Sequence, residues 1–369
     1  MTRSIKELLS GVEVEWRKLG DVAEIKRGKR VVKSQLKNSE KYPVYQNSMT
    51  PLGYYHEYNV QADTTFVISA GAAGEIGYSD IDFWAADDVY FFLTPNGIIN
   101  KFIYYFLLTR HHKITSQVRR ASVPRLSKKV IEKLQIPIPP LDIQKEIVRI
   151  LDAFTELTTE LTTELTTELT ARKKQYAYYR DRLLAFDEGE VEWRKLGDEE
   201  YVAIENNKRK PVKASLRNPG NIPYYGANNI QDYVDGYTHV GEYVLIAEDG
   251  SKSLENYSIQ YSKGKFWANN HVHVIKGTSK LNTKFLYYYL QTFNFMPYLS
   301  GGDRAKLTKT KMLEIPIPIP LLEKQKEIVA ILDKFDALTN SITEGLPREI
   351  ELRQKQYGYY RDRLLNFRR

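Results

Sequence analysis

The sequence repeats itself, and this repeat constrains the fold more than any other feature of the 369 residues. The octapeptide V-E-W-R-K-L-G-D begins at Val14 and recurs unchanged at Val191. A second block, Q-K-E-I-V-x-I-L-D-x-F, begins at Gln144 and at Gln325, and a third, Q-Y-x-Y-Y-R-D-R-L-L-x-F, follows in each half. Both later blocks recur at an offset of 181 residues, so the segments that join them have equal length. The chain therefore consists of two halves with one layout.

The two stretches between the repeated blocks, residues 22–134 and 199–313, resemble each other only thinly. Random drift after a duplication would erode all parts of the two halves evenly, so this contrast needs a cause. We expect the shared segments to contact the same partner twice, and the two variable stretches to contact two different ligands.

Each shared segment begins with a proline-rich run and continues in a long amphipathic pattern. The runs I-P-I-P-P-L from Ile136 and I-P-I-P-I-P-L from Ile315 lack an amide donor at every proline, so they predict extended chain. Helices are expected to begin near Asp142 and Leu322. An unbroken first helix to Phe186 would measure about 70 Å. A lone helix of that length needs a neighbour, so the matching helix of the second half predicts an antiparallel pair with a pseudo-twofold axis.

Four identical Thr-Glu-Leu-Thr tetrads, residues 155–170, occupy the middle of the first shared segment. A threonine-rich linker remains an alternative, because threonine is only a moderate helix former. The i,i+4 spacing of the leucines favours a helix, since it makes a stripe that drifts only about 40° per tetrad; the leucines are Leu157, Leu161, Leu165 and Leu169. The corresponding stretch of the second half contains Gly345 and Pro347, which predict a kink or an interruption.

Each variable stretch combines strand-like runs with a helix, which is typical of a mixed α/β domain. The apolar and β-branched runs predict strands, and the aromatic-rich runs after them predict helices. The expected strands are residues 65–69, 88–93, 243–247 and 272–275, and the expected helices are residues 100–109 and 282–292. Three glycines, Gly71, Gly74 and Gly77, are expected to mark turns.

Basic, amide-rich clusters occupy corresponding places in the two variable stretches. K-R-G-K-R begins at Lys26 and N-N-K-R-K at Asn206, while R-R-A-S-V-P-R begins at Arg119 and G-G-D-R-A-K at Gly301. Lysine and arginine hold phosphates, and asparagine, glutamine and arginine pair with base edges in the major groove. One such cluster alone would be an ordinary solvated surface, but four in matching places favour a nucleic-acid partner. The net charge of +8 agrees with a polyanionic partner.

Motifs of enzyme chemistry are missing from the sequence. It has no G-x-x-x-x-G-K-[ST], no G-x-S-x-G and no H-E-x-x-H, and His271 and His273 lack a third metal ligand. The absence of cysteine excludes disulfides and thiolate metal sites. No apolar run approaches the roughly 20 residues that span a bilayer, and the start has no apolar signal core. We therefore expect a non-catalytic, cytoplasmic protein that holds no metal and contacts no membrane.

Taken together, these motifs resemble one family over nearly the whole chain, the specificity subunits of type I restriction–modification enzymes. The resemblance rests on the repeated octapeptide, on I-P-I-P-P-L-D-I-Q-K-E-I-V and on the tetrads before Arg172. The tetrads resemble the short tandem repeats that one branch of this family carries in its central segment. The family implies two mixed α/β target recognition domains separated by a long antiparallel helical pair, or coiled coil. The recognition domains would be residues 1–140 and 188–320, and the helical segments residues 141–187 and 321–369.

The resemblance also implies a function. Each recognition domain would read one half of a bipartite, gapped target in double-stranded DNA, and the helices would dock two methyltransferase subunits and set the spacer. Restriction subunits would join the full complex. The chain itself would hold no cofactor, and S-adenosylmethionine, ATP and magnesium would belong to the partner subunits. A non-DNA scaffold, with two variable ligand-binding domains on a helical spacer, remains the alternative.

Candidate site residues come from the basic clusters, from the amides of Y-P-V-Y-Q-N and I-P-Y-Y-G-A-N-N, and from the third repeated block. The candidate DNA contacts of the first domain are Arg27, Lys29, Arg30, Gln46, Asn47, Arg120 and Arg125. Those of the second domain are Asn207, Lys208, Arg209, Asn228, Asn229, Arg304 and Lys306. The candidates for the methyltransferase interface are Tyr176, Tyr179, Arg180, Tyr357, Tyr360 and Arg361.

Overall fold

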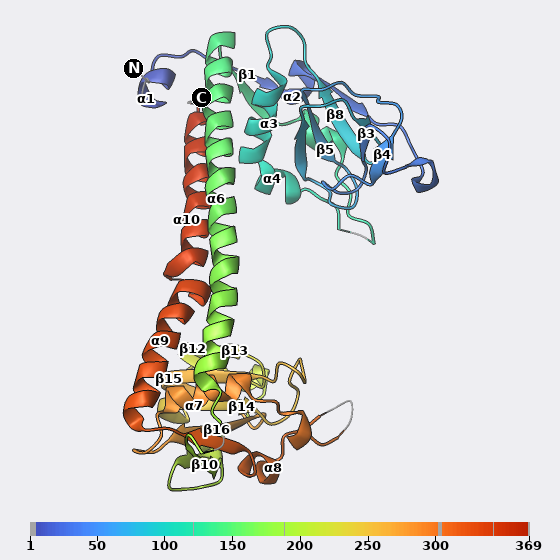
Figure 1. Ribbon diagram of the computed structural model, residues 1–369. Helices are drawn as coiled ribbons and strands as arrows, with labels where there is room; N and C mark the ends of the chain where they lie inside the picture. Colours follow the sequence, from blue (N-terminus) through green and yellow to red (C-terminus); the bar gives the residue numbers. More distant parts are fainter. Residues whose placement is uncertain (1–4, 121, 188, 302–304, 342, 368–369) are drawn as a thin grey trace. The chain divides into compact units, whose positions relative to one another are not determined.

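The computed structural model describes residues 5–120, 122–187, 189–301, 305–341 and 343–367 (Figure 1). The chain divides into two compact units, one formed by Met1–Leu165 with Ile350–Arg369 and the other by Thr166–Glu349. Each unit contains one variable domain, one end of a long helix α6 and a helix from the C-terminal segment. The duplication in the sequence therefore has a structural counterpart.

The first unit holds a four-stranded antiparallel sheet, a three-stranded mixed sheet and a two-stranded ribbon. One sheet has the order β2-β8-β5-β6, a second has the order β4-β3-β7, and β1 pairs with β9. Helix α3 packs on the first sheet and lies between it and α6 (Figure 1). The elements are β1 (Glu15–Lys18), β2 (Glu24–Arg27), β3 (Tyr42–Tyr45), β4 (Gly53–Tyr55), β5 (Thr64–Ile68), β6 (Ile76–Ser79), β7 (Trp84–Ala85), β8 (Val89–Leu93), β9 (Gln135–Ile138), α1 (Ile5–Leu9), α2 (Leu19–Val22), α3 (Asn100–Thr109), α4 (His111–Thr115) and α5 (Lys128–Glu132).

The second unit repeats this plan with one fused sheet. Its order is β11-β16-β14-β15-β12-β13, with β10 and β17 as the separate ribbon. The long strand β15 pairs antiparallel with β14 and parallel with β12. In the first unit these two pairings are made by two separate strands, β6 with β5 and β7 with β3. The elements are β10 (Glu192–Lys195), β11 (Val202–Ile204), β12 (Pro219–Tyr225), β13 (Ile230–Val234), β14 (His239–Ala247), β15 (Ile259–Ala268), β16 (Val272–Gly277), β17 (Pro316–Ile319), α7 (Thr283–Thr292) and α8 (Lys309–Leu313). The predicted mixed α/β architecture is confirmed in both units.

One of the predicted turns is wrong. Gly77 lies inside β6, paired with Phe66 of β5. A Cβ atom at Gly77 would stand 2.3 Å from Cζ of Phe66 and 2.7 Å from Cε of Met49. The glycine is therefore required by a buried aromatic ring that crosses the strand, and not by a change of chain direction. Gly71 and Gly74 do have the left-handed φ values, +80° and +97°, that favour glycine.

The long helix is continuous through the tetrads. Helix α6 runs from Leu141 to Leu184, and its 44 residues give a length of about 66 Å. The threonine hydroxyls donate to carbonyls one turn earlier, as Thr162 does to Thr158 at 2.7 Å and Thr163 does to Thr159 at 2.7 Å. The linker alternative is therefore wrong.

The second half is interrupted where glycine and proline predict it. Helix α9 (Leu322–Asn340) ends before α10 (Gly345–Leu364) begins. Gly345 has φ of +80°, and a Cβ atom there would lie 2.4 Å from the carbonyl oxygen of Ala337. Pro347 falls in the first turn of α10, where a missing amide donor costs no helical hydrogen bond.

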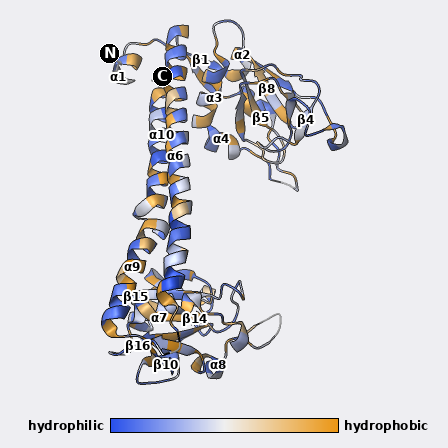
Figure 2. Cartoon of the chain, in the orientation of Figure 1, coloured by the Kyte–Doolittle hydropathy of each residue, from blue (hydrophilic) through white to orange (hydrophobic). Residues whose placement is uncertain are grey.

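The repeated blocks pair crosswise between the halves. In the first unit, the Phe154 ring of the second block stacks on Tyr360 of the other half's third block, with centroids 5.4 Å apart. In the second unit, Phe335 stacks on Tyr179 at 5.7 Å. In the first unit, Thr155 follows Phe154 along α6, whereas its partner Tyr357 precedes Tyr360 along α10, so the two helices run antiparallel, as predicted. Hydrophobic and hydrophilic residues alternate along these helices (Figure 2), and among the described residues no helix is both long and apolar enough to cross a membrane.

A buried glutamine at the start of each long helix explains part of the repeat. The Gln144 amide accepts from the Ile99 amide nitrogen at 3.0 Å and donates to the carbonyl of Pro139 at 2.9 Å. Gln325 makes the same two bonds, from the Asn282 nitrogen at 2.7 Å and to Pro320 at 2.8 Å. Each glutamine therefore ties the start of its long helix to the start of α3 or α7.

An aspartate eight residues after each glutamine makes a second connection between the long helix and the variable domain. Asp152 accepts from the Tyr105 hydroxyl at 2.6 Å and pairs with Lys101 at 2.9 Å. Asp333 does the same with the Tyr288 hydroxyl at 2.6 Å and with Lys284 at 2.8 Å. Burial, followed by the bond to aspartate, raises the pKa of both tyrosines. The second repeated block thus holds each variable domain to its own helix, which accounts for its identity without an external partner.

The octapeptide has the same kind of role. Leu19 and Leu196 are completely buried, and their amides donate at 2.8 Å to the carbonyls of Leu134 and Ile315. A Cβ atom at Gly20 would come within 3.0 Å of Cβ of Glu132, and one at Gly197 within 3.0 Å of Cβ of Leu313. The repeated Leu-Gly pair therefore sets the close approach of the β1 and β10 ribbons to α5 and α8.

Replacing Gln144 by alanine is expected to lower the free energy of unfolding by about 1–3 kcal/mol, because it empties a buried site and leaves the partly buried Ile99 amide without a partner. Denaturant unfolding of the full chain measures this loss. Gln325→Ala should cost a similar amount, since its bonds are equivalent. The exposed neighbour Lys145→Ala is the matched control, and an equal loss in that variant would contradict the role of the glutamine.

Candidate nucleic-acid interface

In the first domain, loops distant in sequence meet at one end of the sheets. The Ala72 amide donates to the carbonyl of Asn47 at 2.9 Å, and the Gly71 amide donates to that of Pro124 at 3.2 Å. Arg125 bridges to Ala70 and to Arg119. The two predicted clusters with Asn47 and Arg125 therefore belong to one surface, which also carries the exposed Arg120 and the half-buried Gln46.

The basic loop after β2 is fixed by its backbone. The Gly28 amide donates to Val89 at 3.0 Å, and a Cβ atom at Gly28 would stand 2.2 Å from the carbonyl oxygen of Ala85. The Arg27 guanidinium donates to the carbonyl of Asp87 and lies 3.9 Å from the Asp88 carboxylate. Lys29 and Arg30 follow directly and are exposed. Among the described residues their side chains have no hydrogen-bond or ion-pair partner, so they are available to a ligand.

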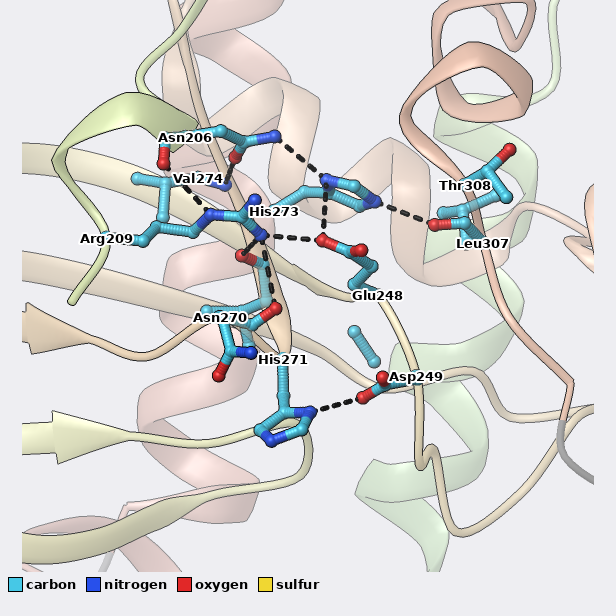
Figure 3. A network of polar contacts seen from close by, with 12 residues as sticks. Asn206, Arg209, Glu248, Asp249, Asn270, His271, His273, Val274, Leu307 and Thr308 are labelled. Atoms are coloured by element: carbon cyan, nitrogen blue, oxygen red, sulfur yellow. Dashed lines mark hydrogen bonds and ion pairs between the residues drawn. The ribbon is translucent and has the colours of Figure 1, made fainter. Parts of the chain in front are cut away.

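In the second domain the corresponding loops are held by charged side chains (Figure 3). Arg209 is only 18% exposed and donates to Glu248 at 2.7 Å and to the carbonyl of Val272 at 2.8 Å. Lys306 pairs with the other oxygen of Glu248 at 3.0 Å. Burial raises the pKa of Glu248, but the bonds from Arg209 and Lys306 outweigh it and the pKa is lowered overall. Two predicted DNA contacts, Arg209 and Lys306, are therefore already neutralised within the domain.

A buried histidine completes this network. Nε2 of His273 lies 2.7 Å from the carbonyl oxygen of Leu307, so it donates, and Nδ1 accepts from the Asn206 amide at 3.0 Å. Burial lowers the pKa of His273. His271 is exposed and pairs with Asp249 at the loop surface. The two histidines thus serve different loops, and no group of three metal-binding side chains occurs in the part of the chain that the structure describes.

The other predicted contacts of the second domain fall into two groups. Asn228 braces two loops, since its amide donates to Gly250 at 2.7 Å and accepts from the Lys252 nitrogen at 2.9 Å. Lys208 pairs with Glu205. Asn207 and Asn229 are exposed, without a side-chain partner among the described residues. Arg304 lies outside the described residues.

One pair of residues at this surface was missed by the sequence reasoning. The indole nitrogen of Trp84 donates to the carbonyl of Lys29 at 2.9 Å, and that of Trp267 donates to Lys210 at 2.7 Å. The Lys29 and Lys210 amides donate back to Ala85 and Ala268. The signal was the dipeptide W-A in a shared F-W-A, which occurs once in each half at an offset of 183 residues.

The candidates for a partner interface are divided between inner and outer positions on the helices. Tyr176 contacts Phe335, and burial raises its pKa to about 12. The Tyr357 hydroxyl lies 3.0 Å from the Thr155 hydroxyl, and Arg180 and Arg361 pair with the adjacent Asp181 and Asp362. With Tyr179 and Tyr360 in the stacks, these tyrosines serve helix pairing. The outer positions of the same block are Tyr178 and Tyr359, each 58% exposed and each accepting from an arginine, Arg182 or Arg363.

The fold and both halves of the sequence match one group of known proteins. A family model described as "Type I restriction modification DNA specificity domain" matches residues 11–171 and again residues 189–352. The Escherichia coli EcoR124I/EcoR124II specificity subunit is 33% identical over 403 residues, which cover 98% of this chain and 96% of that subunit. A putative type I restriction enzyme specificity subunit of Haemophilus influenzae is 65% identical over 181 residues, and the match spans 48% of this chain and 46% of that relative.

Solved structures share the fold at low identity. A type I restriction–modification S subunit from M. genitalium superposes with a TM-score of 0.58 at 18% identity and covers 100% of both chains. A chain from a structural study of complex assembly and conformational transition of the type I R-M system gives 0.60 at 17%, covering 97% of this chain and 98% of that one. With the family model matching each half once, the chain belongs to the type I restriction–modification DNA specificity family, as a sequence-recognition subunit and not a catalytic one.

Proposed function

We propose that this chain reads a bipartite, gapped target in double-stranded DNA, one half with each variable domain. The observation that carries the proposal is the pair of loop surfaces built on the same frame with different side chains. Backbone and glycine contacts fix the surface of the first domain, whereas the Arg209–Glu248–Lys306 network fixes that of the second. One frame with two side-chain sets suits two half-sites that differ in sequence but share the geometry of the duplex.

The proposed division of the chain follows from this reading. Residues 1–140 and 188–320 are the two target recognition domains, and residues 141–187 and 321–369 are the helical segments that separate them. The proposed direct DNA contacts are the polar side chains of the loop surfaces without a partner among the described residues: Lys29, Arg30, Gln46, Asn47, Arg120, Arg125, Asn207 and Asn229. Arg27, Lys208, Arg209, Asn228 and Lys306 already bond within their domains, so we assign them first to holding the loops.

We further propose that the third repeated block docks two methyltransferase subunits, one at each copy. The inner tyrosines, with Arg180 and Arg361, shape this surface, and the exposed Tyr178 and Tyr359 contact the partner. Exposed aromatic side chains beside arginine are typical of protein interfaces. S-adenosylmethionine is assigned to those methyltransferase subunits, and ATP with magnesium to the restriction subunits that complete the complex.

The test is to express the chain with a type I methyltransferase subunit and to map methylated bases in the cellular DNA. We expect a methylated adenine in each half of one gapped motif. The purified complex should also bind duplex DNA with an affinity that falls steeply with salt, by a slope of about −0.9 per phosphate contact. A scaffold for protein ligands predicts no motif and no such slope. In the same preparation, Tyr178→Ala with Tyr359→Ala should reduce recovery of the methyltransferase subunit, whereas Leu321→Ala, exposed elsewhere, should not.

A further inference from the structure

Lys29 and Lys210 occupy structurally equivalent positions, although the loops before them differ. In the first domain, β3 and β7 pair Tyr45 with Ala85, and in the second, β12 and β15 pair Tyr225 with Ala268. Each of these alanine carbonyls accepts the amide of one lysine, Lys29 at 2.9 Å and Lys210 at 3.0 Å. The tryptophan before each alanine donates its indole N–H to the carbonyl of the same lysine. Two hydrogen bonds thus fix the backbone of one lysine in each domain.

The loops differ immediately before this point. In the first domain, the Gly28 amide donates to the carbonyl of Val89. In the second, the loop is longer, and the Arg209 guanidinium donates to the equivalent carbonyl of Val272, at 2.8 Å. Both carbonyls stand five residues after the anchoring tryptophan. A backbone donor has been exchanged for a side-chain donor, and the lysine that follows keeps its place.

The other cations of these loops are not available in both domains. Arg27 bonds to Asp87, and Lys208 and Arg209 pair with Glu205 and Glu248. Arg30 follows Lys29 directly, and the residue equivalent to it in the second domain, directly after Lys210, is Pro211. Arg125 and Lys306 hold equivalent bridges, but Lys306 is neutralised by Glu248. Among the described residues of the loop surfaces, the exposed and unpaired cation that both domains share is Lys29 in one and Lys210 in the other.

An exposed, unpaired cation that two divergent readers share suits the part of the target that the two half-sites have in common. The bases of the half-sites differ, while the phosphodiester backbone is the same, and phosphate contacts carry no sequence information. We propose that Lys29 and Lys210 are equivalent phosphate contacts, one for each half-site, and that Trp84 and Trp267 are the positioning residues that aim them. This inference rests on the proposed DNA-reading function and adds Lys210, Trp84 and Trp267 to its site.

The experiment uses the full chain in complex with its methyltransferase subunit. Binding is measured over a range of salt concentrations, on a duplex with both half-sites and on duplexes with either half-site scrambled. Lys29→Ala and Lys210→Ala should each weaken binding by about tenfold and reduce the magnitude of the salt slope by about 0.9. The ratio of target to scrambled affinity should stay unchanged. The matched control is Lys18→Ala with Lys195→Ala, which removes two exposed lysines of the repeated octapeptide and should alter neither affinity nor slope.

The tryptophans are tested in a double-mutant cycle, which separates positioning from folding. Trp84→Phe removes the indole donor but keeps an aromatic ring. It should weaken binding by about threefold and lower the thermal midpoint only slightly, because the exposed Lys29 carbonyl can bond to water instead. In the Lys29→Ala background it should have no further effect, because the side chain that it aims is gone. Trp267→Phe should behave in the same way toward Lys210.

Each contrary result has a distinct meaning. A changed target-to-scrambled ratio in Lys29→Ala or Lys210→Ala would make that lysine a base contact and overturn the proposal. An unchanged salt slope would show that neither lysine touches phosphate. A Trp84→Phe effect that persists without Lys29 would reject the positioning role. If the wild-type complex shows no target preference and no salt dependence, the proposed DNA-reading function fails, and with it this inference.

Discussion

Deleting one Thr-Glu-Leu-Thr tetrad, residues 159–162, is expected to move methylation to a target with the same two half-sites and a spacer shorter by one or two base pairs. The deletion shortens α6 by about 6 Å, and successive base pairs are about 3.4 Å apart. Methylation at the original spacing should fall by about 100-fold, because a displacement of even about 1 Å between positioned groups has effects of this size. Sequencing of methylated DNA from cells that carry the variant reads both changes at once.

The matched control keeps the length of the helix. Thr159→Ala with Thr162→Ala alters the same tetrad without removing a residue, and alanine is the better helix former, so the target should be unchanged. If the deletion changed the sequence of either half-site, the helix would be more than a spacer. An unchanged spacer would show that α6 does not set the distance at all.

Exchanging residues 22–134 for the corresponding stretch of a relative with another target should replace one half-site and leave the other half-site and the spacer intact. The reason lies in how the domain is held. Gln144 bonds only to backbone atoms, at Ile99, Gly97 and Pro139, so a domain with the same backbone can make these bonds. Asp152 instead needs two side chains of α3, Lys101 at its start and Tyr105 one turn later.

The incoming domain should therefore be chosen with tyrosine and lysine at those two positions. A second exchange, with phenylalanine in place of that tyrosine, separates docking from reading, since it should weaken the unit without changing the motif. Mapping of methylated sites gives the result, with near-complete replacement of the first half-site expected. Appearance of a new sequence in both half-sites would contradict the independence of the two readers.

Much of the frame could be predicted from the sequence, because local chemistry decides it. The prolines of the I-P-I-P runs fix β9 and β17, and the helices begin at Leu141 and Leu322, directly after them. The leucine spacing identifies α6 through a threonine-rich stretch, and Gly345 marks the interruption. The prediction of a turn at Gly77 was wrong because the aromatic ring that requires a glycine there, that of Phe66, lies on a neighbouring strand.

The sequence predicts the loop surfaces only as clusters of basic and amide residues. Which of these side chains bond within the domain and which stay exposed depends on tertiary contacts. Nothing local distinguishes Arg209, which is turned toward Glu248, from Lys210, which is exposed. Glu248 is 39 residues away in the sequence. Asn228 is likewise committed to a loop more than twenty residues on. The third repeated block shows the same limit, because its inner tyrosines pair the helices while Tyr178 and Tyr359 remain exposed.

The break between Asn340 and Gly345 has a consequence for inheritance. By the offset of 181 residues, the four tetrads of α6 correspond to the stretch of the second half in which α9 ends and α10 begins. A continuous second helix would force any added or lost tetrad to be matched by an equal change in its own gene segment. The interrupted one imposes no such requirement. The four tetrads of α6 can therefore change in number independently of the second half. If α6 sets the spacer, the gain or loss of one tetrad gives a daughter cell a new target, and with it a new set of protected sites in its genome.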